Sequence, residues 1–271
     1  MAIGEIHVKN ISKSFPVNGK NTTVLDDISL ELHPKEITVI LGKSGCGKTT
    51  LLRIIGGLEK ADAGQIEYEG DSRMAFVFQE PRLMPWLSVY DNIKFSGKKI
   101  GITDNEIRNL INIVGLRGFD NSYPNQLSGG MQHRVSIARA MAYKPSFIMM
   151  DEPFAALDYF TREQMQNELR EMQHKQHMSI LFVTHSIDEA LLLGNNIVLI
   201  ENGRIKKSFN IPESDSVRDL MNPSMIAIKQ QILEQFKNTI TFSKEEKNVK
   251  ENNFDNACSE PCRKPFCWLR K

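Results

Sequence analysis

The residues with the clearest chemical potential lie in a short glycine-rich segment near the N-terminus. Gly42 to Thr49 reads Gly-Lys-Ser-Gly-Cys-Gly-Lys-Thr, which fits the pattern G-x-x-x-x-G-K-[ST]. Glycine lets successive backbone N–H groups turn toward an anion, and a helix that follows directs its positive end at the same anion. The segment therefore predicts a phosphate-binding loop, in which Lys48 contacts the terminal phosphates and the Thr49 hydroxyl binds Mg²⁺.

Two acids stand at the end of an apolar segment later in the chain. Phe147 to Met150 is apolar throughout and is followed directly by Asp151 and Glu152. A buried strand that delivers carboxylates beside bound phosphates can serve phosphoryl chemistry. Asp151 is predicted to hold Mg²⁺ through water, and Glu152 is predicted to orient and deprotonate an attacking water.

The elements that must position these groups alternate between strands and helices. β-Branched and apolar runs predict strands, and apolar residues at helical spacing predict helices. The expected strands are Glu5 to Ile11, Thr23 to Leu32, Glu36 to Leu41, Gln65 to Tyr68, Met74 to Phe78, Phe147 to Met150, Ile180 to Val183 and Ile197 to Ile200. The expected helices are Thr49 to Leu58 and Arg162 to His174, with a mainly helical stretch from Pro81 to Tyr143. This alternation favours an α/β fold with a mostly parallel sheet, and the glycine-rich loop lies between a strand and a helix.

A third motif distinguishes this chain from other phosphate-loop proteins. Leu127-Ser128-Gly129-Gly130-Met131-Gln132 precedes an expected helix, so the Ser128 hydroxyl and the next N–H groups form a second anion site. Together with the phosphate loop and the acidic strand, this segment resembles the signature of ABC-type ATPases. The resemblance covers roughly residues 5 to 212.

The resemblance implies a fold and a cofactor set. The fold is a P-loop NTPase core with an antiparallel β subdomain and an inserted α-helical subdomain at about 81–145. ATP and Mg²⁺ are the implied cofactors. Residues 1–228 are expected to form the ATP-binding domain. The composition becomes polar after about Ile228, which predicts that residues 229–271 form a flexible C-terminal extension.

The resemblance also assigns roles to individual residues. Glu152, His185 and Gln79 are the implied catalytic residues, and Thr49, Gln79 and Asp151 the implied metal ligands. Phe15 matches the aromatic residue that stacks on adenine, although a core aromatic residue is its ordinary alternative. The implied nucleotide-binding residues are Phe15, Gly42, Lys43, Ser44, Gly45, Cys46, Gly47, Lys48, Thr49, Thr50, Ser128, Gly129, Gly130, Gln132 and Asp158.

The same family implies partners. Ser128 to Gly130 of one copy is expected to face ATP held by Lys48 of a second copy, with Ala156 to Asp158 crossing between them. Gln79 to Trp86 resembles the segment in importers of the nitrate, sulfonate and taurine group that receives a helix of the membrane permease. Exposed Leu83, Met84 and Trp86 suit such docking. A solute-binding protein is an indirect partner, and the transported solute stays open.

The composition limits the alternatives. Lys plus Arg number 34 and Asp plus Glu number 33 in 271 residues, a balance that argues against a nucleic-acid partner. We expect a cytosolic chain at the inner face of the membrane, because no apolar run is long enough to cross a bilayer. A soluble ABC-type ATPase acting on another macromolecule is the alternative function. A regulatory module without turnover is a third, which the intact Lys48, Asp151, Glu152 and His185 oppose.

Three cysteines near the C-terminus lie outside the resemblance. Cys258, Cys262 and Cys267 could bind metal, sense redox state or remain reactive thiols, and a structural zinc site requires four ligands. The basic and aromatic residues around them could also contact an anionic membrane surface. Cys46 stands at a loop position that needs no thiol chemistry.

Overall fold

The computed structural model describes residues 3–70, 73–211 and 218–236. The chain divides into two compact units, one ending at Ile226 and the other beginning at Ala227. A helix over residues 223–236 is the last described element, and the three C-terminal cysteines lie beyond the described residues. The predicted domain boundary at residue 228 remains a prediction.

A six-stranded sheet forms the centre of the first unit in the described part of the chain. Its order is β5-β6-β7-β3-β8-β9, and all neighbours are parallel except β8 and β9. The strands are β3 (Ile37–Leu41), β5 (Met74–Val77), β6 (Phe147–Asp151), β7 (Ser179–Thr184), β8 (Asn196–Glu201) and β9 (Arg204–Asn210). The prediction of a mostly parallel α/β sheet is therefore confirmed.

A second, antiparallel sheet is built from the N-terminal strands. Its order is β2-β1-β4, with β1 (Ile3–Val17), β2 (Lys20–Leu32) and β4 (Ala63–Gly70). β1 and β2 alternate between buried apolar residues and exposed polar ones, the pattern of a sheet with one solvated face. This sheet matches the antiparallel subdomain that the family resemblance implied.

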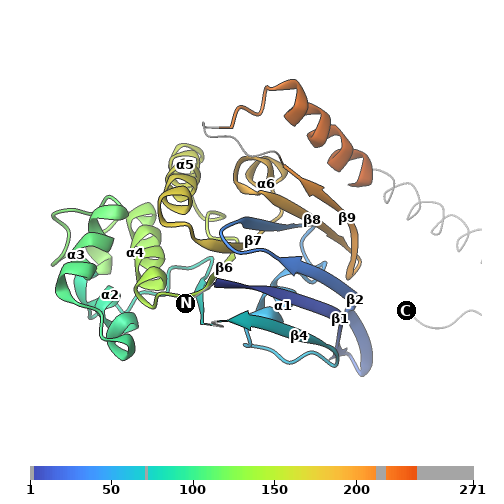
Figure 1. The fold of residues 1–271 in the computed structure, drawn as a ribbon, viewed down its shortest axis with the longest axis horizontal. Coiled ribbons are helices and arrows are strands. Elements are labelled where there is room, and N and C mark those ends of the chain that lie inside the picture. Colours follow the sequence, from blue (N-terminus) through green and yellow to red (C-terminus); the bar gives the residue numbers. More distant parts are fainter. Residues whose placement is uncertain (1–2, 71–72, 212–217, 237–271) are drawn as a thin grey trace, which may run out of the picture. The chain divides into compact units, whose positions relative to one another are not determined.

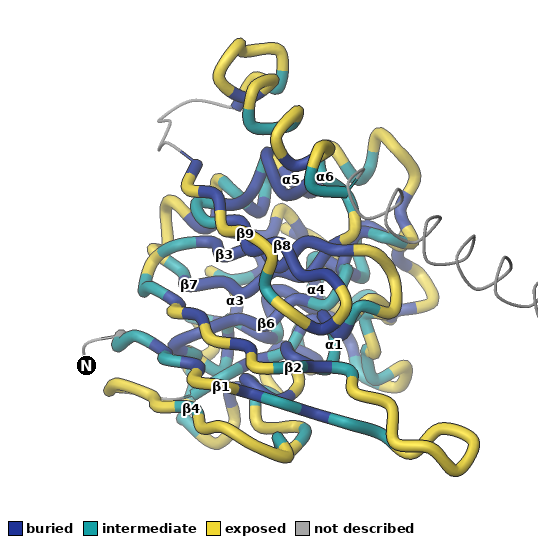
Figure 2. Tube along the Cα trace, turned by 90° about the vertical axis from the view of Figure 1, so that its right-hand side faces the viewer, coloured by how far each residue is buried: buried dark blue, intermediate teal, exposed yellow. Residues whose placement is uncertain are grey.

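Helix α1 (Lys48–Ile55) lies between the two sheets (Figure 1). Its buried Leu51, Leu52 and Ile55 join one core with apolar residues of both sheets. Figure 2 shows the central strands buried along their length, whereas the tip of the β1–β2 hairpin is exposed. The phosphate loop before α1 is thus followed directly by a helix that is buried in the hydrophobic core.

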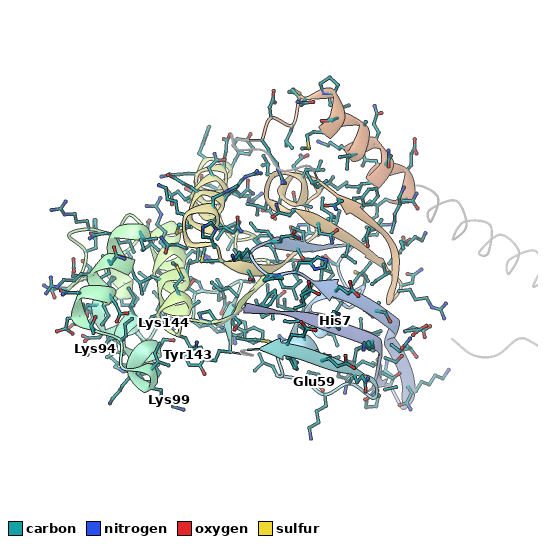
Figure 3. All side chains as sticks on the ribbon, viewed as in Figure 1. His7, Glu59, Lys94, Lys99, Tyr143 and Lys144 are labelled. Carbon is teal, nitrogen blue, oxygen red and sulfur yellow. The ribbon has the colours of Figure 1, made fainter. Side chains whose placement is uncertain are left out.

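The inserted helical region contains three α-helices in the described residues, α2 (Val89–Gly97), α3 (Asp104–Ile113) and α4 (Gly129–Ala142), and two short 3₁₀ turns, η1 (Lys98–Ile100) and η2 (Pro124–Gln126). Thr103 and Glu106 form a reciprocal cap at the start of α3. Lys144 binds Glu106 at 2.6 Å, and Lys94 of α2 lies 3.5 Å from Asp104. Figure 3 labels both lysines. These ion pairs hold the first turn of α3 against its two neighbours, and the bond to Lys144 helps to lower the Glu106 pKa to about 2.

Helices α5 (Tyr159–Gln176) and α6 (Ile187–Leu193) cover the face of the central sheet opposite α1 (Figure 1). The sequence pattern predicts α5 but neither α6 nor β9. The signal for α6 was present, because Ser186 caps the helix and Glu189 stands three residues later. Across the described ranges, no helix combines the length and apolarity that a membrane span requires.

The contact between Phe154 and Phe182 allows a test of the hydrophobic core. Phe182 on β7 is fully buried, and its ring centroid lies 5.8 Å from that of Phe154. Phe182→Ala should lower the free energy of unfolding by about 3–5 kcal/mol, because it leaves a cavity in a close-packed core. Urea titration of the nucleotide-free protein measures this effect. Phe95→Ala, at a position 57% exposed on α2, is the control. Equal effects of the two substitutions on the free energy of unfolding would contradict the assignment of Phe182 to the core.

Candidate functional site

The glycine-rich loop connects β3 to α1 and has a backbone that only glycine tolerates. Gly45 and Gly47 have φ values of 81° and 100°, in the left-handed region. A Cβ at Gly47 would lie 2.7 Å from both the Val24 carbonyl oxygen and a Leu25 methyl carbon. No side chain caps the first turn of α1, so its N–H groups are available to an anion. The geometry supports the predicted phosphate loop.

Lys48 carries its charge into the middle of this loop. Its side chain is 5% exposed, and Nζ donates to the carbonyl oxygens of Gly42 at 2.9 Å and Lys43 at 3.0 Å. Nζ also lies 3.8 Å from Glu152 Oε1. The ammonium group therefore stands between the loop and the acidic strand, where the phosphates of a nucleotide would lie in the predicted complex.

Thr49 and Asp151 join the loop to the end of β6. The Thr49 hydroxyl donates to Asp151 Oδ1 at 2.9 Å. Burial raises the pKa of the Asp151 carboxyl, and the Thr49 hydrogen bond opposes this rise. A hydroxyl and a carboxylate are the hard oxygen ligands that Mg²⁺ prefers, and a cation here would stabilise the buried carboxylate. The residues present therefore fit the predicted magnesium site.

Glu152 and His185 form the third contact of the site. Glu152 Oε2 lies 2.9 Å from His185 Nδ1, and the Glu152 N–H donates to the Val183 carbonyl at 3.0 Å. The φ of Glu152 is 44°, an unfavourable value for a non-glycine residue. Such strain persists only where the surroundings impose it and is concentrated at functional sites. Lys48, Thr49, Asp151, Glu152 and His185 thus form one contact network, which we call the phosphate-site cluster.

Ser128 and its neighbours form a separate group at the start of α4. The Ser128 hydroxyl accepts from the Met131 N–H at 3.3 Å, as a helix cap does. The Gln132 amide donates to the carbonyls of Pro124 and Leu127, at 2.9 and 3.3 Å, so this predicted nucleotide ligand supports the loop before Ser128. Gly130 is buried against α5, and a Cβ there would approach Thr161 to 2.8 Å.

The other predicted residues occupy the surroundings of these two groups. Asp158 caps α5 by accepting from the Thr161 N–H at 3.0 Å, and its hydrogen bonds with Thr161 lower its pKa. Gln79 is exposed just after β5. Phe15 is half-buried on β1, and the Lys13 ammonium lies 5.1 Å from its ring centroid.

The remaining loop residues are Lys43 and Ser44, which are exposed, and Thr50, which is half-buried. Burial raises the pKa of the Cys46 thiol, which disfavours its reactive thiolate form.

The expected docking segment is less exposed than its sequence indicated. Leu83 and Met84 are half-buried, and Trp86 alone of the three is exposed, at 71%. Arg139 of α4 contributes to the burial of this segment, because its guanidinium donates to the carbonyls of Pro81 and Arg82 and holds the segment against the helix. The prediction of an exposed Leu83 and Met84 is wrong for this structure.

Comparison with known proteins places these motifs in a family. A family model described as ABC transporter matches residues 25–155. The chain is 41% identical over 248 residues to an uncharacterized ABC transporter ATP-binding protein of Methanocaldococcus jannaschii, covering 87% of this chain and 92% of that one. It is 39% identical to an aliphatic sulfonates import ATP-binding protein of Bacillus subtilis, covering 84% and 92%. It is 42% identical to a probable sulfate/thiosulfate import ATP-binding protein of Chlorella vulgaris, covering 74% and 89%.

A solved structure has the same fold. It is a dimeric, post-hydrolysis state of an ATP-binding cassette bound to ADP and Pi, with a TM-score of 0.67 and 28% identity. The match covers 77% of this chain and 100% of that one.

The position of Lys48 leads to a prediction about binding. Lys48→Ala should weaken the binding of a nucleoside triphosphate by about 10- to 100-fold, the loss expected for one or two charge-assisted hydrogen bonds. Calorimetric titration with a non-hydrolysable triphosphate measures the affinity. Lys60→Ala, which removes an exposed lysine just beyond α1, is the control. Equal affinities of the two variants would refute the assignment of Lys48.

Proposed function

Because this chain belongs to the ATP-binding subunits of ABC transporters, we propose that its ATPase activity powers the import of a small solute through membrane subunits. The proposed solutes are nitrate, sulfonate, taurine or a related small molecule, in line with the sulfonate and sulfate/thiosulfate import relatives. The proposed location is the cytoplasmic face of the membrane, where the chain is held by its partners.

The phosphate-site cluster is the observation that carries this proposal. Lys48 and the N–H groups of the loop bind the phosphates of ATP. Thr49 and Asp151 hold Mg²⁺, with Gln79 as an additional ligand, and the ion neutralises charge on the phosphates. The contacts of Lys48 and Thr49 with carbonyl and carboxylate oxygens support this assignment, because they hold the ammonium group and the hydroxyl beside the acidic strand.

Glu152 is the proposed general base. A water oxygen attacks the γ-phosphorus, a proton of that water passes to the Glu152 carboxylate, and the bond to the β–γ bridging oxygen breaks to leave ADP and phosphate. His185 orients Glu152 through the 2.9 Å contact and stabilises charge on the γ-phosphate. The position of the Glu152 carboxylate, 3.8 Å from Lys48 Nζ and in contact with His185, supports this role, and its positive φ is of a kind concentrated at functional sites.

A second copy completes the proposed site. Ser128 to Gly130 present a capped helix N-terminus whose polar contacts lie within their own segment, separate from the phosphate-site cluster. In the proposed dimer this helix faces the ATP held by Lys48 of the other copy. The dimeric cassette with ADP and Pi supports this arrangement. Tyr159 and Phe160, directly after Asp158, are 70% and 79% exposed and suit burial against a second copy.

The membrane subunits are proposed to dock at the segment from Gln79 to Trp86. Trp86 supports this assignment because a large aromatic side chain that is 71% exposed is typical of a binding hot spot. Leu83 and Met84 are half-buried, so Trp86 offers the larger accessible surface of the three residues. The solute itself does not meet this chain in the proposed system, so its identity depends on the partners.

Replacing the proposed base separates binding from turnover. Glu152→Gln should slow ATP hydrolysis by about 10²- to 10⁴-fold, the size of a general-base effect, and should retain ATP in a dimer. Phosphate release and sedimentation with ATP measure the two properties. Glu163→Gln, at an exposed acid on α5, is the control. Normal hydrolysis by the Glu152 variant would remove Glu152 from the mechanism.

The docking surface has its own test. Trp86→Ala should reduce co-purification of membrane subunits with the tagged chain by about 10-fold or more, as for a hot-spot residue, while ATP hydrolysis by the isolated chain is unchanged. Quantitative mass spectrometry of detergent extracts measures the recovery. Leu58→Ala, at a position 57% exposed beyond α1, is the control. Undiminished recovery of a permease with the Trp86 variant would place docking elsewhere, and the absence of any permease with the unmodified chain would favour a soluble ATPase.

A further inference from the structure

A buried carboxylate that the proposed reaction does not use lies beneath the site. Glu189, in the first turn of α6, is 7% exposed, and its neighbour Asp188 is exposed. Acidic side chains are rarely buried unless they are paired, because burial removes the hydration of the charge. The partners of Glu189 therefore indicate what its burial serves.

One oxygen of Glu189 holds the loop that carries His185. The Thr184 hydroxyl donates to Glu189 Oε2 and at the same time accepts from the Ser186 N–H at 3.0 Å. The Ser186 hydroxyl in turn accepts from the Glu189 N–H at 3.3 Å. Both residues that flank His185 are thus tied to Glu189, whereas the His185 side chain is itself 55% exposed.

The other oxygen of Glu189 faces helix α5. Gln166, a buried residue of α5, donates from Nε2 to Glu189 Oε1 at 3.1 Å. Arg162, one turn earlier, has Nε 3.9 Å from the same oxygen. The guanidinium of Arg162 also donates to the carbonyls of Phe154 at 3.2 Å and Leu157 at 2.8 Å. Arg162 therefore holds the loop between Glu152 and Asp158.

We infer that Glu189 is a positioning residue that couples the His185 loop to the segment from Glu152 to Asp158. One carboxylate joins the two loops through Thr184 on one side and through Arg162 on the other, while Gln166 binds the carboxylate to α5. A displacement of one loop is passed to the other, because the carboxylate and its partners are packed between rigid elements. The inference rests on the proposed function, in which His185 meets the γ-phosphate and Asp158 lies near the second copy. Glu189 thereby makes turnover depend on dimer closure.

The substitution Glu189→Gln tests this coupling at nearly constant volume. It removes the negative charge that faces Arg162, whereas the bonds to Thr184 and Gln166 can be kept, because the Gln166 amide can turn its oxygen toward the new amide. We expect kcat to fall by about 10- to 100-fold, the effect of a small displacement of catalytic groups. Affinity for a non-hydrolysable triphosphate should change less than about 3-fold, because the Lys48 contacts are intact. Asp188→Asn, at the neighbouring exposed acid, is the matched control.

A swap of the two buried partners distinguishes positioning from mere stability. In the double variant Gln166→Glu with Glu189→Gln, the amide and the carboxylate exchange sides, and the negative charge returns on α5 one turn after Arg162. We expect the swap to restore most of kcat, which the single variant loses. Thermal unfolding is measured in parallel for all variants.

The outcomes separate the two proposals. An unchanged kcat in Glu189→Gln, or losses of kcat, affinity and thermal stability together with no recovery in the swap, would overturn the coupling role. ATP-dependent dimer formation is measured with Glu152→Gln alone and with Glu152→Gln plus Glu189→Gln. Dimer formation in the first and its loss in the second support coupling. If Glu152→Gln alone forms no dimer, the proposed dimer fails, while kcat and affinity still report on Glu189.

Discussion

The parallel pairing of three strands is the constraint on which the site depends. Leu41 at the end of β3 pairs with Thr184 of β7, and Asp151 at the end of β6 pairs with Val183. The carboxyl ends of these strands therefore lie at one edge of the sheet, the edge at which open α/β proteins bind ligands. The loops that follow them carry Lys48, His185 and Glu152. A shift of one residue in either pairing would turn the side chains of the shifted strand to the opposite face of the sheet and displace the group that follows it.

The buried charged groups at this edge use only part of their own hydrogen-bonding capacity within the protein. Lys48 binds two carbonyl oxygens, and Asp151 binds a single hydroxyl. An ammonium group has three donors and a carboxylate accepts several bonds, so each retains capacity for phosphate or a cation.

The sequence predicted the parts of this site that depend on local residue order. The phosphate loop, the acidic strand and the helix behind Ser128 each combine a strong local pattern with neighbouring apolar periodicity, and all three elements form where expected. Contacts between distant segments were not predictable in the same way. From the sequence alone, Glu189 would be placed at the surface, and its burial depends on the contact with Gln166 of α5. Leu83 is likewise expected to be exposed, and its burial depends on a segment that Arg139 holds against α4. Short elements such as β9 escape detection because tertiary pairing, rather than composition, stabilises them.

The burial of Glu189 and the exposure of His185 have a common explanation. In the proposed mechanism His185 meets a phosphate at the surface between two copies, where few contacts can fix a side chain. His185 is 55% exposed and contacts Glu152 at its side, so its orientation depends on the backbone beneath it. Thr184 and Ser186 fix that backbone through Glu189, and the same carboxylate reaches the loop that ends at Asp158. The structure therefore combines an exposed His185 with a buried carboxylate whose contacts lead to both loops, as the proposed coupling requires.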